Sequence, residues 1–424
     1  MIGELWYNTP IEFRRLHIIQ QKEVDSMKKL STTMENMEVS SIRKLTQYAE
    51  DARAAGKKVY HLNIGQPDLP VPPEYYEYIR AFDEDTVEYM PSQGIPELLT
   101  AMETYYQAHG LNFKSHHIAI TTGGSEAILL TMLAMTDPGD EYIVFEPYYS
   151  NYNTCFTMSG GIPIPVTTDV NNGFHFERKA LEAKITERTK GIIVTNPGNP
   201  TGTVLTPEEL RVIADVAKEH DLYIISDEVY REIVFDGREI SSFGYLEDIH
   251  DRLVIIDSVS KRFSACGARI GAVITKNEQL YNTIFKCCQG RLSVSTLEQH
   301  GAVGLYSTGF RIIDQERVEY EKRRDTAYEA LVKIPGLKCR KPEGAFYMMC
   351  KLPVKDATDF LIWMLEEFED EGETIMAAPG EGFYATDGLG KDEIRIAFII
   401  KCESLKRAIE ILGKGLAEYN KTER

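Results

Sequence analysis

The sequence GIIVTNPGNPTG at residues 191–202 combines two features that decide the fold. Residues 191–194 form a short apolar run, which is typical of a strand buried on both faces. Residues 196–202 hold two prolines and two glycines, and this composition predicts a rigid loop directly after the strand. Such a loop can present Asn199 to a cleft, although a purely structural turn would fit the same residues.

Similar apolar runs occur on both sides of this stretch, at residues 118–121, 142–145, 223–226, 253–256 and 271–274. Segments of helical length and spacing, such as 125–135 and 207–219, lie between them. Repeated alternation of strand and helix predicts an α/β fold with a largely parallel sheet. After about residue 318 a charged helical stretch, two apolar runs and further helices predict a smaller α+β domain.

The composition excludes several functional classes. The chain has 424 residues and a net charge of −18, so nucleic acid is not expected as a partner. No apolar stretch reaches the roughly 18 residues that span a bilayer, which predicts a protein without membrane association. Seven cysteines lack paired C-x-x-C spacing, so we expect reduced thiols in the cytoplasm and no metal site. Residues 1–36 are interpreted as an N-terminal extension, either a dimer arm or a segment upstream of a start at Met27 or Met34.

Polar residues follow several of the predicted strands, where doubly wound sheets bind their ligands. The turn TGGSE at residues 122–126 opens a helix and predicts a phosphate site, although a ligand-free turn would also fit. Asp227 leaves a buried strand and requires a cationic or N–H partner, unless it is a solvated loop acid. Lys261, in SVSKRFSACGAR at residues 258–269, is a candidate imine-forming amine if it is desolvated, and otherwise a surface lysine.

Together these motifs resemble the fold-type-I, pyridoxal-5′-phosphate (PLP) dependent class I/II aminotransferases, which include aspartate aminotransferase. The resemblance rests on NPGNPTG (196–202), SDEVY (226–230) and SVSKRF (258–263), with Arg269 eight residues after the lysine. It extends over about residues 36–415. It implies a large PLP-binding domain at 66–318 with a mostly parallel seven-stranded sheet. It also implies a small domain built from residues 37–65 together with 319–424.

The resemblance assigns cofactor roles to individual residues. Lys261 forms the internal aldimine with PLP and carries the substrate proton, and Asp227 keeps the pyridine nitrogen protonated. Tyr230 and Asn199 hydrogen-bond the ring oxygen, and Tyr149 stacks on the ring. The implied phosphate ligands are Gly124, Ser125, Ser258, Ser260, Arg269 and, from a neighbouring subunit, Tyr89. This last role implies a homodimer with active sites at the subunit interface.

The resemblance also implies how a substrate is held. Arg395, in DEIRIAF at residues 392–398, is expected to bind the α-carboxylate with two hydrogen bonds, with Gly65 and Asn199 beside it. Read alone, this arginine fits a structural ion pair equally well. Ser125 stands where relatives that act on dicarboxylates sometimes have a lysine, which leaves Arg291 as a candidate for that role or as a surface arginine. Three aromatic residues form the small-domain wall of the cleft or simply pack in the core: Phe346, Tyr347 and Phe383.

We therefore expect a transaminase with a ping-pong cycle. Aspartate is the first expected amino donor, alanine or an aromatic amino acid comes next, and 2-oxoglutarate is the expected acceptor. A carbon–sulfur β-lyase of the cystathionine type is an alternative that the same cofactor residues allow. A PLP-binding regulator is a further alternative, but 36 residues leave too little room for a DNA-binding module and the net charge has the wrong sign.

Overall fold

The computed structural model describes residues 28–35, 37 and 39–421. The chain divides into two units, residues 1–37 and residues 38–424. In the first unit, helix α1 spans Thr32–Glu35 and contains Met34, whereas Met27 and most of the expected extension lie outside the described residues. The description below concerns the second unit.

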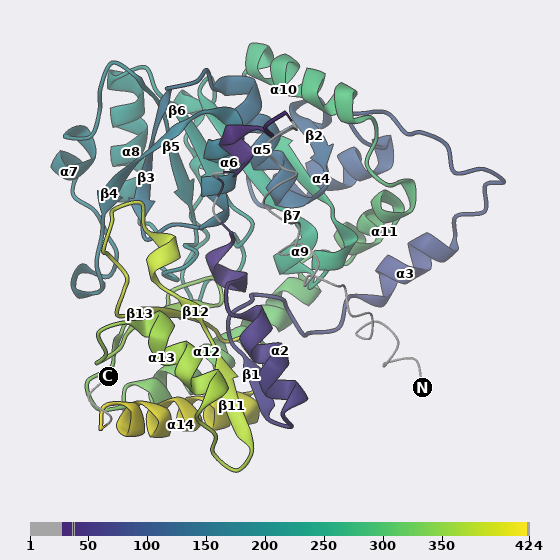
Figure 1. Cartoon of the computed structure of the whole chain (residues 1–424). Coiled ribbons are helices and arrows are strands. Elements are labelled where there is room, and N and C mark those ends of the chain that lie inside the picture. The colour runs from purple at the N-terminus through teal and green to yellow at the C-terminus, as the bar shows by residue number, and fades with distance from the viewer. Residues whose placement is uncertain (1–27, 36, 38, 422–424) are drawn as a thin grey trace. The chain divides into compact units, whose positions relative to one another are not determined.

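A seven-stranded sheet forms the centre of this unit (Figure 1), with the strand order β2-β8-β7-β6-β5-β3-β4. Neighbouring strands are parallel except at β8, which is antiparallel to both β2 and β7. The mostly parallel seven-stranded sheet implied by the sequence is thereby confirmed. The strands are β2 (Ile118–Thr121), β3 (Glu141–Glu146), β4 (Ile162–Thr167), β5 (Thr189–Thr195), β6 (Tyr223–Asp227), β7 (Leu253–Ser258) and β8 (Gly271–Ile274).

Helices cover both faces of this sheet. Ile224 packs in one apolar cluster and Ile225 in another, because successive strand residues point to opposite faces. The first cluster includes side chains of α3 (Pro73–Arg80), α4 (Pro96–Ala108), α8 (Pro207–Glu219) and α11 (Thr296–Ser307). The second includes side chains of α5 (Gly123–Met135), α6 (Asn151–Ser159) and α10 (Glu278–Arg291). Continuous apolar strands are therefore explained by a sheet buried between two helical layers.

Strand β4 has no counterpart among the apolar runs of the sequence. Its sequence IPIPVT holds Pro163 and Pro165, which lack the N–H group that a central strand needs. The structure places β4 at the edge of the sheet, next to β3 alone. Prolines are tolerated at this edge. Because they interrupt the apolar run, a search for such runs does not identify the strand.

A second group of elements has its own apolar core. Its antiparallel sheet has the order β12-β13-β10-β9, and β1 pairs in parallel with β11. The strands are β1 (Lys58–His61), β9 (Lys338–Cys339), β10 (Tyr347–Lys351), β11 (Glu373–Met376), β12 (Ala378–Pro379) and β13 (Glu393–Ala397). The surrounding helices are α2 (Thr46–Ala54), α13 (Ala357–Glu366) and α14 (Cys402–Tyr419). Leu45 and Leu62 also pack in this core, so the stretch before the central sheet contributes to it.

Helix α12 (Arg311–Leu331) connects the two cores, because Ile313 packs in the first and Ala327 in the second. It begins seven residues before the stretch at 318 where the sequence indicates a change of pattern. The remaining short elements are α7 (Arg178–Glu182), α9 (Val259–Arg262), η3 (Ser41–Arg43), η4 (Ser115–His117), η5 (Val170–Asn172), η6 (Phe243–Tyr245), η7 (Glu247–Ile249), η8 (Cys266–Ala268) and η9 (Glu381–Phe383).

Across residues 28–35, 37 and 39–421, none of the helices has the length and apolar character that crossing a bilayer requires.

Candidate active site

The predicted site residues converge at one edge of the central sheet. Strands β5, β6 and β7 are parallel and end at this edge, whereas the antiparallel β8 begins there. Their connections line a cavity of about 590 Å³. Most of the predicted cofactor and substrate residues lie in its wall: Gly65, Gly124, Ser125, Tyr149, Asn199, Asp227, Tyr230, Ser258, Ser260, Lys261, Arg269 and Arg395. Of the three aromatic candidates Tyr347 also lies there, whereas Phe346 and Phe383 are buried in the small-domain region outside this lining.

Lys261 lies on the single-turn helix α9, which follows β7 directly. Its Nζ donates a hydrogen bond of 2.8 Å to the carbonyl oxygen of Gly65. The ammonium also lies 5.6 Å from the ring centroid of Phe346 and 5.9 Å from that of Tyr230. The amine is half-buried and hydrogen-bonds a neutral acceptor, so no carboxylate has to release it before it reacts.

Asp227 is a buried acid at the end of β6. One carboxylate oxygen accepts a hydrogen bond of 2.7 Å from the Tyr152 hydroxyl, and the other accepts one of 3.4 Å from the backbone N–H of Val229. Burial raises the pKa of Asp227 to about 6, although these hydrogen bonds act in the opposite direction. No cation within residues 39–421 forms an ion pair with it, so a cationic ligand group would satisfy this carboxylate.

Two turns form a cup for an anion. Gly124 and Ser125 lie in the first turn of α5, where backbone N–H groups and the helix dipole favour negative charge. Ser258 ends β7 and Ser260 lies in α9, with their hydroxyl oxygens 2.7 Å apart. The Arg269 guanidinium reaches the same cup and donates to the carbonyls of Cys266 at 2.9 Å and Thr122 at 3.3 Å. Hydroxyls, N–H groups and a guanidinium are the donors that a phosphate monoester requires.

At the other end of the cavity Arg395 is a buried cation. It lies on β13, is 1% exposed, and stacks on Tyr347 with a centroid distance of 4.3 Å. One guanidinium nitrogen donates to Asn199 Oδ1 at 2.9 Å and another to the carbonyl of Asn63, while Nε has no partner in the described part of the chain. Burial lowers the pKa of Arg395, because neutral acceptors compensate its charge incompletely. The site is therefore prepared for a carboxylate.

These residues fit PLP and an amino-acid substrate. The anion cup matches the PLP phosphate, and the buried Asp227 matches a protonated ring nitrogen. Lys261 supplies a primary amine to the same cavity, as the PLP aldehyde requires. The Tyr230 hydroxyl, 2.9 Å from that of Tyr347, faces the same space. Burial raises the pKa of Tyr230 well above its usual range, so it stays a hydrogen-bond donor.

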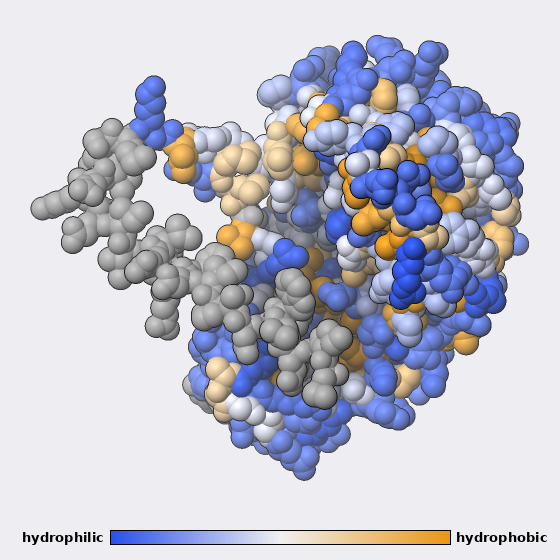
Figure 2. All heavy atoms as spheres, turned by 90° about the vertical axis from the view of Figure 1, so that its right-hand side faces the viewer, coloured by the Kyte–Doolittle hydropathy of each residue, from blue (hydrophilic) through white to orange (hydrophobic). Residues whose placement is uncertain are grey.

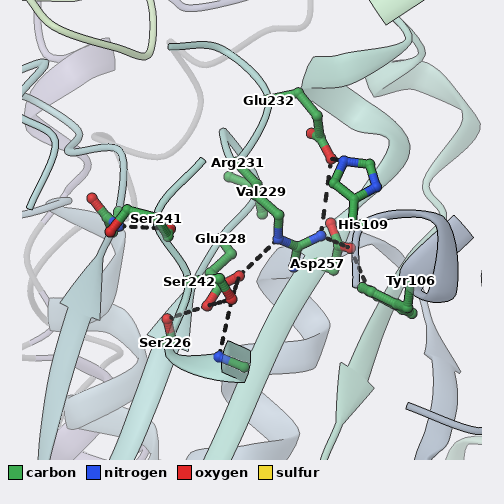
Figure 3. Close-up of polar contacts among 12 residues, drawn as sticks. Tyr106, His109, Ser226, Glu228, Val229, Arg231, Glu232, Ser241, Ser242 and Asp257 are labelled. Atoms are coloured by element: carbon green, nitrogen blue, oxygen red, sulfur yellow. Dashed lines mark hydrogen bonds and ion pairs between the residues drawn. The ribbon is translucent and has the colours of Figure 1, made fainter. Parts of the chain in front are cut away.

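A buried ion network lies beside these groups (Figure 3). Arg231 contacts Glu228 at 2.8 Å and Asp257 at 3.2 Å. Arg262 binds both Asp257 and, at 3.1 Å, Glu232. Burial alone would raise the pKa of Asp257, but the charges of Arg262 and Arg231 lower it below the ordinary value. Its members adjoin the site residues in sequence, since Glu228 follows Asp227 and Arg262 follows Lys261. The network therefore ties the ends of β6 and β7 to each other.

Two further predicted residues lie elsewhere. Tyr89 is 82% exposed on the connection between α3 and α4, which Figure 1 shows extending away from the neighbouring helices. Arg291 does not line the cavity of its own chain. Its guanidinium donates to the carbonyl of Ile120 at 2.9 Å and lies 3.4 Å from Glu126, so backbone and acid neighbours already hold it.

The sequence analysis did not identify Tyr152, Asn63 and Arg43, although they bind site residues or line the cavity. Tyr152 reaches Asp227 because α6 packs on the sheet, and no local pattern indicates that contact. Asn63 lies two residues before Gly65, so the sequence offered it close to a residue that was identified. Arg43 lies in a polar stretch without any periodic signal.

Comparison with known proteins agrees with this geometry. The family model for aminotransferase class I and II matches residues 57–412. Aspartate aminotransferase from Bacillus subtilis is 30% identical, covering 92% of this chain and 100% of that protein. The structure of aspartate aminotransferase from Thermus thermophilus with maleate has a TM-score of 0.84 at 28% identity, and alanine aminotransferase from Pyrococcus furiosus has 0.85 at 29%. Each structure matches 92% of this chain and 100% of its own.

The raised pKa of Asp227 predicts a pH-dependent effect of Asp227→Asn on the cofactor-free protein. Its folded-state pKa of about 6 exceeds the value near 3.9 of an unfolded chain, so the carboxyl destabilises the fold progressively as pH rises through this interval. The amide carries no such penalty. Relative to wild type, the variant should gain about 1 kcal/mol between pH 5 and pH 8. Thermal melts at both pH values measure this gain, and a pH-independent difference would contradict the assignment.

The close packing around Gly271 predicts that a larger residue at this position weakens PLP binding. Gly271 pairs with both Thr121 and Ser258, between the two turns of the anion cup, and a Cβ there would lie 2.7 Å from the Gly124 nitrogen. Gly271→Ala should displace the Gly124 turn, weaken PLP binding at least tenfold and cost about 1–3 kcal/mol of stability. Equilibrium titration with PLP measures the affinity.

Gly267→Ala is the matched control, because a Cβ at that position meets open space. It should bind PLP as the wild type does. Normal PLP affinity in Gly271→Ala, or equal losses in the two variants, would show that close approach of β8 does not shape the cup.

Proposed function

The chain belongs to the class I and II aminotransferases, which are PLP-dependent transaminases, and we propose that it transfers the amino group of aspartate to 2-oxoglutarate by a ping-pong mechanism. The observation that carries this proposal is the buried guanidinium of Arg395, which shares one cavity with the amine of Lys261 and has a nitrogen without a partner among the described residues. An α-amino acid presents a carboxylate that complements the charge of Arg395 and an amine of the same chemical kind as that of Lys261.

At the cofactor end of the cavity, different residues bind different parts of PLP. Bound PLP supplies an aldehyde for the amine and a ring that accepts electrons from the substrate. Asp227 holds the ring nitrogen protonated, since a buried carboxylate is stabilised by a cation. Gly124, Ser125, Ser258, Ser260 and Arg269 fix the phosphate, and Tyr149, Asn199 and Tyr230 orient the ring. Lys261 would hold PLP through its amine and, when free, would take up and return the proton at the substrate Cα.

At the substrate end, Arg395 anchors the α-carboxylate with two parallel hydrogen bonds. Asn199 holds the guanidinium in plane through its bond of 2.9 Å, and Gly65 brings the main chain close to the bound carboxylate. A carboxylate fixed in this way sets the direction of the Cα–H bond relative to the ring. Because the Cα–H bond is held in this orientation, Lys261 can move the proton in both half-reactions.

We further propose a homodimer in which Tyr89 reaches the phosphate of the neighbouring site. This proposal is supported by large apolar side chains that are exposed in the single chain and that a partner would cover. They lie on α3, on the connection that follows it and after α10: Tyr76, Tyr78, Val87, Tyr89 and Leu292. Figure 2 looks onto that side of the molecule and shows hydrophobic residues among hydrophilic ones. A cytoplasmic location is also proposed, because all seven cysteines are free thiols.

Separate cores support the proposed division into a large domain at residues 66–318 and a small domain built from 37–65 with 319–424. The central sheet and its helices bury two apolar clusters, and the smaller sheet lies against a third. Arg395 belongs to the small domain and Lys261 to the large one. Relative motion of the domains would therefore change the distance between the guanidinium that binds the substrate carboxylate and the amine that binds the cofactor.

Substitution of Arg395 tests the proposed function. Arg395→Ala should lower kcat/KM for every amino donor by roughly 100-fold or more, the equivalent of about 3 kcal/mol. Arg395→Lys keeps the charge without the planar pair of donors and should recover part of the loss. Initial rates with a panel of donors and 2-oxoglutarate give these values, and PLP absorbance reports whether the cofactor is retained.

Failure of the wild type to transfer an amino group from any donor to 2-oxoglutarate would overturn the proposed function. Equal losses in the alanine and lysine variants together with loss of PLP would instead show that Arg395 supports the fold and does not bind substrate.

A further inference from the structure

The cavity contains one more cation than the proposed function uses. Its basic lining residues are Arg43, Lys261, Arg269 and Arg395, whereas Asp227 is its acid. In the proposed function, Lys261 reacts with the cofactor, Arg269 binds its phosphate and Arg395 binds the α-carboxylate. These assignments leave Arg43 without a role, although it lines the cavity and can bind an anion there.

Arg43 is held close to the substrate-binding guanidinium by the main chain. Arg395 donates to the carbonyl of Asn63, and the Asn63 side-chain amide donates at 3.0 Å to the carbonyl of Ile42. Arg43 is the next residue. Two hydrogen bonds therefore connect the residue that binds the α-carboxylate to the turn that carries this second arginine.

Packing fixes the same turn from its other side. Element η3 (Ser41–Arg43) packs against β12 and η9, and β12 pairs with the strand that carries Arg395. Gly382 of η9 leaves space for the Ser41 side chain, since a Cβ there would overlap it. The backbone of Arg43 is thus placed by contacts with the small sheet, while its side chain is exposed and lines the cavity.

The guanidinium of Arg43 is available for a ligand. Within residues 28–35, 37 and 39–421, it makes neither a side-chain hydrogen bond nor an ion pair with an acid. Arg291 offers a contrast in position, because its Nη2 donates to the Ile120 carbonyl, its Nε faces Glu126 at 3.4 Å, and the side chain lies outside the cavity wall. Of the two arginines, Arg43 is the one that shares a cavity with Lys261 and Arg395.

We propose that Arg43 binds the side-chain carboxylate of dicarboxylic substrates, and so determines specificity for them. The inference rests on the proposed function. It assigns two guanidinium groups of one chain to the two carboxylates of a single substrate, one buried at Arg395 and one exposed at Arg43. Because both half-reactions use the same cavity, Arg43 serves aspartate as donor and 2-oxoglutarate as acceptor.

Arg43→Ala tests this assignment. Loss of a charge-assisted hydrogen bond should lower kcat/KM for aspartate and 2-oxoglutarate about 10- to 100-fold, and change that for alanine and pyruvate less than about threefold. Lys44→Ala is the matched control, since Lys44 is the adjacent exposed cation and does not line the cavity. It should leave all four values unchanged.

Binding of an unreactive dicarboxylate gives a readout that is independent of turnover. Calorimetric titration of the PLP-loaded enzyme with succinate should show affinity at least tenfold weaker in Arg43→Ala than in Lys44→Ala, with unchanged PLP content. Equal effects of Arg43→Ala on aspartate and alanine, or unaltered succinate affinity, would overturn the inference. Absence of amino transfer in the wild type would instead overturn the proposed function, and the succinate titration would still decide the role of Arg43.

Discussion

The buried ion network of Arg231, Asp257 and Arg262 is the constraint on which the site depends. Through Arg231 it joins Glu228, which directly follows Asp227, to Asp257, and Asp257 and Arg262 flank the turn at residues 258–261. Burying charges is costly unless each is paired, and removing one partner leaves the others uncompensated. The network therefore fixes the ends of β6 and β7 relative to each other. Fixed strand ends are what allow a carboxylate and an amine to face one ligand at defined positions.

Charge inside the cavity has the opposite sign to the charge of the whole chain. The net charge is −18, yet the cavity wall carries three arginines, one lysine and a single acid. Anions such as a phosphate ester and a carboxylate are thus bound by local cations against an unfavourable overall field. Asp227 is the exception, and its raised pKa reflects burial without a cation of the protein's own. A ligand with negative ends and a cationic ring matches this distribution.

Sequence alone predicted the parts of the fold and site that depend on local patterns. Apolar runs identified six strands, and the motifs around Asn199, Asp227 and Lys261 identified residues that share one cavity. Strand β4 was missed because Pro163 and Pro165 interrupt its pattern. Tyr152 and Arg43 were missed because their positions depend on how α6 and η3 pack on distant elements. Arg291 was a reasonable candidate for a side-chain carboxylate, but its Glu126 contact could not be read from the sequence.

The central claim is that Lys261 is the amine that binds the cofactor. The most direct test is borohydride reduction of the PLP-loaded protein, followed by proteolysis and mass spectrometry of the peptides. The account predicts a phosphopyridoxyl group on Lys261, and none on this peptide in Lys261→Ala. A reduced adduct on another lysine, with Lys261 unmodified and the visible absorbance of Lys261→Ala unchanged, would contradict the account.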